Sequence, residues 1–271
     1  MSLADAVDYA RKYDLHELAI ARDGEIVAEE YGDGWVPERP HALYSGTKSF
    51  WGVTALLAHE DGLLDLDETV AATFPAWDVP GKRLVTLRML LQLTAGIGFG
   101  GLGNAVPLYA KALEVELKNA PGTSFTYGGV PLQIFGAVFA RKLEARGQTP
   151  HRYLQLRLLD PLGVAVGSWR TLSDGTRPLP TGAFLSAREW IKYGLFMARG
   201  GFDEALRGSS ANPRYGLGWW LGLKGAPEDL FYASGSGGQG MYVVRSERTV
   251  AVHFGGKPAY DHAAFVKRLF A

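Results

Sequence analysis

The feature that most constrains the fold is the presence of strand-like segments at both ends of the chain, with helical segments between them. Near the N-terminus, apolar residues within 18–31 flank Arg22-Asp23-Gly24, an Asp-Gly signal typical of a tight β-hairpin. Near the C-terminus, residues 241–245 and 249–254 flank a second short turn at 246–248. Because the strands of a hairpin are antiparallel, these patterns predict one antiparallel sheet built from both chain ends.

Between the two ends, apolar residues recur mainly with helical spacing, and glycine or proline separates nearly every segment. The expected helices span 45–61, 86–94, 106–118, 130–146, 150–160 and 187–199, and a closing helix is expected over 261–270. The sequence therefore predicts an α+β fold. Residues 1–44 and 207–271 would form a sheet lobe flanked by helices, residues 45–206 a mostly helical lobe, and the active site would lie at their junction.

Composition excludes several classes of function. The 271 residues include 28 basic and 28 acidic side chains, so no charge excess favours binding to nucleic acid or to an anionic membrane. No apolar run reaches the roughly 18 residues of a membrane span, and the N-terminus lacks a signal-peptide pattern. We expect a soluble protein and favour the cytoplasm, although the sequence determines neither export of the natural precursor nor oligomeric state.

Metal and cofactor sites have little support in the sequence. The chain has no cysteine, and its six histidines show no recognised ligand spacing. Gly-x-Gly-x-x-Gly occurs at 98–103 and 235–240, but neither match has the strand, turn and helix context of a dinucleotide site. A Gly-x-Ser-x-Gly nucleophile elbow is absent from the sequence. We therefore expect no metal and no cofactor.

Ser45-Gly46-Thr47-Lys48 places a hydroxyl and an amine three residues apart at the expected start of a helix, where both share one face. Lysine has an ordinary pKa of about 10.4, so Lys48 can act as a base near neutrality only if burial and the helix dipole lower that pKa. With 12 serines and 10 lysines in the chain, chance supplies about 0.4 copies of Ser-x-x-Lys. Ser45 as a simple helix cap, with Lys48 in solvent, is the alternative interpretation.

A second candidate lies in the turn-rich stretch 121–129, which leads into the helix expected from residue 130. Tyr127 in this loop can face a cleft, where its phenol can relay protons. The alternative is a tyrosine that only packs against its neighbours.

Taken in order, the segments resemble the superfamily of serine β-lactamases and penicillin-binding proteins, in particular its branch of class C β-lactamases, D-aminopeptidases and related esterases. The similarity extends over most of the chain. The segments that carry it are 44–50, which resembles the nucleophile motif, 61–68, 86–96, 121–127, which resembles the second motif, 182–188 and 215–219.

The resemblance implies Ser45 as nucleophile, Lys48 as its base and Tyr127 as a proton relay, with an oxyanion hole formed by the backbone N–H groups of Ser45 and Ser236. Ser234 and Gly235 align with the last two positions of the third motif and are expected to bind substrate. Four aromatic residues are candidates for pocket walls, and core packing is an equal alternative for each: Trp51, Phe99, Trp219 and Tyr232.

Two positions depart from the family pattern. The second motif is usually Tyr-x-Asn, but Gly129 stands in place of the amide, and Ala233 stands where the third motif usually begins with Lys or His. A β-lactam carboxylate thus loses its expected partner unless an arginine elsewhere supplies it. The sequence favours a cofactor-free serine hydrolase acting on small esters or amides through an acyl-enzyme. A catalytically impaired binding or scaffold protein of the same fold is the alternative.

Overall fold

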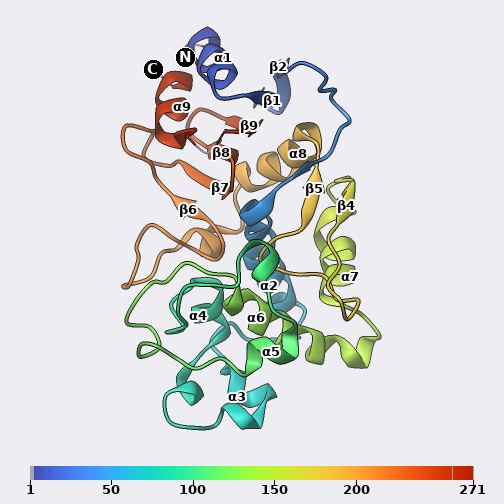
Figure 1. Ribbon diagram of the computed structural model, residues 1–271, viewed down its shortest axis with the longest axis vertical. Coiled ribbons are helices and arrows are strands. Elements are labelled where there is room, and N and C mark those ends of the chain that lie inside the picture. The colour runs from blue at the N-terminus through green and yellow to red at the C-terminus, as the bar shows by residue number, and fades with distance from the viewer. Residues whose placement is uncertain (1–2, 258, 271) are drawn as a thin grey trace.

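Six strands from the two ends of the chain form one antiparallel sheet in the computed structural model, which describes residues 3–257 and 259–270 (Figure 1). The strand order is β2-β1-β9-β8-β7-β6, so β1 and β9 pair and join the two ends. The strand bounds are β1 Leu15–Arg22, β2 Glu25–Tyr31, β6 Trp220–Leu221, β7 Phe231–Gly235, β8 Gln239–Val244 and β9 Thr249–Gly255. The predicted sheet is confirmed.

The strands β1, β8 and β9 are buried on both faces of the sheet because they present apolar side chains alternately to two layers. Leu18 and Ile20 of β1 face the layer formed by α1 (Leu3–Lys12) and α9 (His262–Leu269). The intervening Ala19 and Ala21 face the main core, which includes α8 (Ala187–Ala198). Figure 1 shows α1 and α9 together at one end of the molecule, with α8 on the opposite side of the sheet.

The middle of the chain is mostly helical, which confirms the predicted α+β class. Its helices are α2 Ser49–Glu60, α3 Val70–Thr73, α4 Leu87–Leu91, α5 Tyr109–Leu113, α6 Val130–Leu143 and α7 Pro150–Leu154. A small sheet of order β3-β5-β4 lies beside them, formed by His41–Ala42, Ala183–Leu185 and Ser168–Trp169. The division into lobes at 44/45 and 206/207 stays a prediction.

Several predicted elements differ in extent from the observed ones. Residues 44–48 form a 3-10 turn ahead of α2, and only Tyr109–Leu113 of the expected 106–118 helix is helical. Apolar side chains of a loop also pack on a core, so their spacing alone overstated the helix. The strand expected from Met241 begins at Gln239, and Ala233 to Gly235, expected to precede it, belong to β7. Helix α1 was not predicted.

Helix α2 runs through the centre of the molecule and is enclosed by backbone as well as by side chains. Phe50, Trp51 and Val53 have no exposed surface. A Cβ atom at Gly52 would lie 2.1 Å from the carbonyl oxygen of Leu217, so this position leaves no space for a side chain. The close approach of the 217 backbone fixes the position of α2 and, with it, the turn at its N-terminal end.

We expect Gly52→Ala to lower the free energy of unfolding by roughly 1–3 kcal/mol, because the added methyl group overpacks a backbone contact. Intrinsic propensity alone would predict a gain of about 1 kcal/mol, since Ala is the better helix former. Urea unfolding measures the change. The exposed Glu60→Ala on the same helix is the control and should stay within about 0.5 kcal/mol of the parent. Equal or higher stability for Gly52→Ala would contradict the observed packing.

Candidate active site

The side chains of Ser45 and Lys48 are in direct contact in the turn that precedes α2. The amine Nζ of Lys48 donates a hydrogen bond of 2.9 Å to Oγ of Ser45 and one of 3.2 Å to the carbonyl oxygen of Pro180. Lys48 is 1% exposed, whereas Ser45 is partly accessible. The alternative in which Lys48 is a solvated side chain is therefore wrong, because the folded chain encloses the amine and leaves the hydroxyl reachable.

Burial lowers the pKa of Lys48 to about 7, because the protonated amine loses its hydration inside the protein. At neutral pH the lysine is thus present in comparable neutral and protonated fractions. A neutral amine 2.9 Å from a hydroxyl is within reach to accept its proton. The arrangement can therefore generate a nucleophilic oxygen on Ser45.

The backbone around Ser45 is constrained on both sides. Tyr44 has φ of 46°, a left-handed conformation that is uncommon for a bulky residue. On one side, Gly46 packs against Trp190, whose ring carbon would lie 2.8 Å from an added Cβ. On the other side, a Cβ at Gly235 would lie 2.1 Å from the carbonyl oxygen of Leu43. The end of β7 is therefore pressed against the turn that carries Ser45.

Tyr127 reaches the same place from the loop before α6. Nζ of Lys48 lies 4.8 Å from the centre of the Tyr127 ring. Burial raises the pKa of Tyr127, and a hydrogen bond with Ser45 partly offsets that effect. The ring stacks on Trp220 of β6 at 5.6 Å, with Tyr215 at 6.1 Å. The structure thus brings Ser45, Lys48 and Tyr127 together.

The β7 residues expected to bind substrate differ in orientation. Because side chains alternate along a strand, Ser234 points to the face opposite that of Ala233 and Gly235. Its Oγ lies 3.1 Å from Nε2 of His262 on the α9 side. Substrate binding by Ser234 and Gly235 stays a prediction. Ser236 is exposed in the turn that follows β7, where the role of its backbone N–H stays a prediction.

Two of the four proposed pocket walls are core residues. Trp51 and Trp219 have no exposed surface, so no water-sized group touches them, and the pocket-wall prediction is wrong for both. Nε1 of Trp51 instead donates to the carbonyl oxygen of Leu179 at 2.6 Å. Phe99 is 77% exposed and Tyr232 is partly buried, so their contact with substrate stays a prediction.

The two departures from the family pattern have a structural basis. The N–H of Gly129 donates to the carbonyl oxygen of Gly100 at 2.9 Å, and a Cβ at Gly129 would lie 1.9 Å from the carbonyl oxygen of Gly101. The glycine-rich loop therefore fills the space that an asparagine side chain would need. Ala233 is 1% exposed and packs in the main core.

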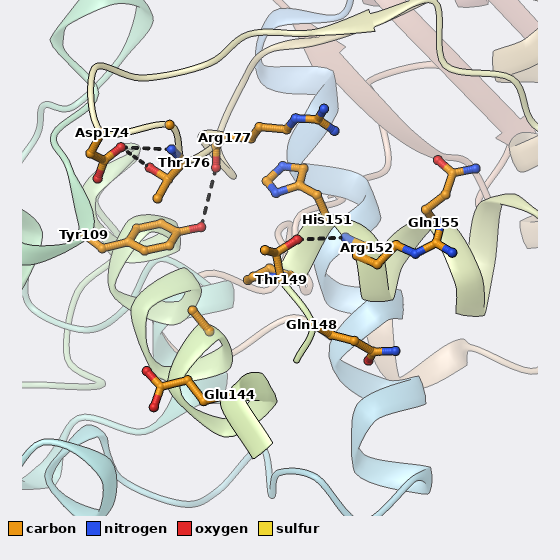
Figure 2. A pocket seen from close by; sticks show the side chains of 13 residues that line it. Tyr109, Glu144, Gln148, Thr149, His151, Arg152, Gln155, Asp174, Thr176 and Arg177 are labelled. Carbon is orange, nitrogen blue, oxygen red and sulfur yellow. Dashed lines mark hydrogen bonds between the residues drawn. The ribbon is translucent and has the colours of Figure 1, made fainter. Parts of the chain in front are cut away.

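Sequence reasoning missed the segment 177–180, whose carbonyl groups hold both Lys48 and Trp51 in place. Backbone carbonyls carry no sequence signal. The same loop forms one wall of a separate cavity of about 770 Å³ (Figure 2), where the hydroxyl of Tyr109 donates to the carbonyl oxygen of Arg177 at 3.4 Å. His151 lines this cavity, and burial lowers its pKa to about 3, so the ring is neutral.

Within residues 3–257 and 259–270, no group of three or more His, Cys, Asp or Glu side chains is arranged to hold a metal ion. In that same part of the chain, no helix combines the length and the apolar character that a membrane crossing requires.

Comparison with known proteins identifies the family. The family model described as Beta-lactamase matches residues 16–258. The chain belongs to the beta-lactamase family. This confirms the resemblance inferred from the motifs. A search of curated proteins found no significant match.

Solved structures of beta-lactamase-like proteins share the fold at low sequence identity. A candidate 6-aminohexanoate-dimer hydrolase from Bacillus anthracis has a TM-score of 0.82 at 16% identity, covering 99% of this chain and 80% of that one. A family VIII carboxylesterase has a TM-score of 0.77 at 16% identity, covering 99% and 97%. A penicillin-binding protein homologue from Caulobacter crescentus has a TM-score of 0.76 at 16% identity, covering 98% and 96%.

We expect the burial of Lys48 to make stability depend on pH. The pKa of this lysine is about 7 in the folded protein and about 10.4 when unfolded, so between these values the unfolded chain binds one more proton. The free energy of unfolding of the parent should rise with pH by about 1.4 kcal/mol per unit in this window. Lys48→Met lacks this gain, so its stability relative to the parent should fall by roughly 3 kcal/mol from pH 7 to pH 9.5.

Urea unfolding at the two pH values measures this difference, with the exposed Lys224→Met as the matched control. The free energy of unfolding of the control should differ from that of the parent by the same amount at both pH values. An equally constant offset for Lys48→Met would show that the folded lysine titrates at its ordinary pKa.

Proposed function

We propose that this protein is a serine hydrolase that cleaves small esters or amides through an acyl-enzyme on Ser45. The observation that carries the proposal is the buried amine of Lys48, with a pKa of about 7 and a hydrogen bond of 2.9 Å to the Ser45 hydroxyl. A buried lysine without a charged partner is costly to keep in a protein. A role in accepting the proton of Ser45 would explain why the protein keeps a buried amine in spite of this cost.

In the first half-reaction, neutral Lys48 accepts the Ser45 proton while Oγ attacks the substrate carbonyl. The N–H of Ser45 lies in the first turn of the helical segment, where N–H groups have no partner within the helix. Together with the N–H of Ser236 it would stabilise the oxyanion, each donor contributing on the order of 3 kcal/mol in the transition state. Tyr127, beside both Ser45 and Lys48, donates its phenolic proton to the leaving group, which departs as an alcohol or amine, and takes up the proton held by Lys48 in return.

In the second half-reaction, water takes the place of the leaving group. Lys48, neutral again, accepts a proton from this water as it attacks the Ser45 ester. The bond between the acyl carbon and Oγ then breaks, the carboxylic acid is released, and Lys48 returns the proton to Oγ of Ser45. The chemistry balances with water as the only co-reactant. The likeness to a family VIII carboxylesterase supports ester substrates for this fold.

Labelling with a fluorophosphonate tests the nucleophile. Ser45 should be the single labelled serine, and the labelling rate should rise with pH through about 7, because deprotonation of Lys48 generates the base. Lys48→Arg should slow labelling by roughly 10²-fold or more, because arginine stays protonated. Peptide mapping by mass spectrometry locates the adduct. Labelling of Ser234 or Ser236 in place of Ser45, or equal rates for parent and Lys48→Arg, would contradict the proposal.

The substrate preference follows from the filled space at Gly129 and the apolar Ala233. Neither position offers the amide or the cation that the resembling β-lactamases present to a β-lactam. The phenol of an activated aryl ester is a good leaving group that needs little protonation. Ser45, Lys48 and the oxyanion donors can therefore suffice for its cleavage. We expect kcat/KM for 4-nitrophenyl butyrate to exceed that for a chromogenic cephalosporin by at least about 10²-fold. A higher value for the cephalosporin would show that other groups replace the missing contacts.

A further inference from the structure

A second cavity, of about 450 Å³, adjoins the Ser45 turn on its β7–β8 side. It reaches the candidate site through Tyr44, which precedes the nucleophile, and through Ser236, the proposed oxyanion donor. The other walls that matter here are Trp35, Arg39 and Phe184. A group bound in this cavity would therefore lie next to the reacting carbonyl.

Arg39 provides a positive charge at this cavity. Its guanidinium carbon lies 4.1 Å from the centre of the Trp35 ring, so the group is stacked on an aromatic face. One hydrogen bond of 3.3 Å joins it to the carbonyl oxygen of Gly34. Within 3–257 and 259–270, no carboxylate lies in ion-pair distance of Arg39, whereas Arg88, Arg157 and Arg188 each have such a partner. Arg39 thus has donors left for a ligand.

The platform under Arg39 is a continuous stack of rings. Trp35 stacks on His16 at 4.1 Å and on His41 at 4.5 Å, and His41 stacks on Phe254 at 4.3 Å. The stack is anchored from below, since Nε2 of His41 lies 3.3 Å from the fully buried carboxylate of Glu17. The rings of Trp35, His16 and His41 give the cavity a flat aromatic wall against which a hydrocarbon chain can pack.

The order of the strands in the sheet indicates which part of a substrate would enter the cavity. Tyr127 stacks on Trp220 of β6, the strand next to β7 at the sheet edge. The cavity is lined by His16 of β1 and Gln239 of β8, on the other side of β7. Tyr127 and the cavity therefore lie on opposite sides of the Ser45 turn. Since Tyr127 protonates the leaving group in the proposed mechanism, the acyl group extends toward the cavity.

We propose that this cavity is the acyl-binding subsite and that Arg39 recognises a carboxylate at the far end of the acyl chain. The substrate class would then be half-esters or half-amides of dicarboxylic acids. Arginine suits this role because its planar guanidinium can donate two hydrogen bonds to one carboxylate. Arg39 would thus place a cation on the acyl side of the reacting carbonyl, from the segment before the nucleophile. This inference rests on the proposed hydrolase function.

Two esters with the same leaving group and acyl length test the inference: 4-nitrophenyl hexanoate and the 4-nitrophenyl half-ester of adipic acid, each corrected for hydrolysis without protein. We expect the parent to prefer the adipate half-ester by at least about fivefold in kcat/KM, mainly through a lower KM, with the preference shrinking at high salt. Arg39→Gln should reduce the ratio to about one, and Arg39→Lys should leave an intermediate value because it keeps only the charge.

Arg152→Gln is the matched control, since Arg152 is an exposed arginine at the other cavity, and it should keep the parental ratio. A merely structural role of Arg39 would change both esters equally and leave the ratio as in the parent. The acyl subsite would be overturned, with the hydrolase intact, if the parent turned over both esters with a kcat/KM ratio near one. The same conclusion would follow if Arg39→Gln left that ratio unchanged. Turnover of neither ester would overturn the hydrolase itself, and this inference with it.

Discussion

The burial of one amine is the constraint on which the rest of this structure depends. Lys48 has two hydrogen-bond acceptors, Oγ of Ser45 and the carbonyl oxygen of Pro180, and its pKa shift has desolvation as its cause. Enclosing it requires α2 to lie in the middle of the molecule. That position in turn demands glycine at two backbone crossings, since a Cβ at Gly52 or Gly218 would lie 2.1–2.3 Å from a carbonyl oxygen.

The same enclosure explains how Lys48 can be partly neutral at neutral pH although no charged group in the described part of the chain is paired with it. An adjacent carboxylate would hold the amine in its protonated form, whereas burial alone favours the neutral form. The cost is a stability penalty that well-packed apolar side chains would not incur. The left-handed backbone of Tyr44 adds local strain at the residue before Ser45, held by the packing of Gly46 and Gly235 on either side.

Strand β7 divides the surroundings of Ser45 into two environments. On the β6 side lie the aromatic rings of Tyr127, Tyr215 and Trp220, among which the leaving group would find its proton. On the β8 side lies the cavity with Arg39. The loop that carries Gly101 closes the space beside Gly129. In the proposed function, specificity would therefore depend more on backbone shape and on a remote arginine than on the usual motif side chains.

The sequence by itself determined the local elements and the reactive pair. The Asp23-Gly24 turn, the hairpin before Thr249 and the periodicity of α8 are short-range signals, and Ser45 and Lys48 are close because three residues span one helical turn. Only the tertiary structure decided what surrounds them. Trp51 and Trp219 lie in the core, and the side chain of Ser234 contacts His262, because packing decides which face of a strand or helix is buried. The acceptor at Pro180 and the cation at Arg39 come from distant segments, whose approach to Ser45 depends on long-range contacts that no local pattern encodes.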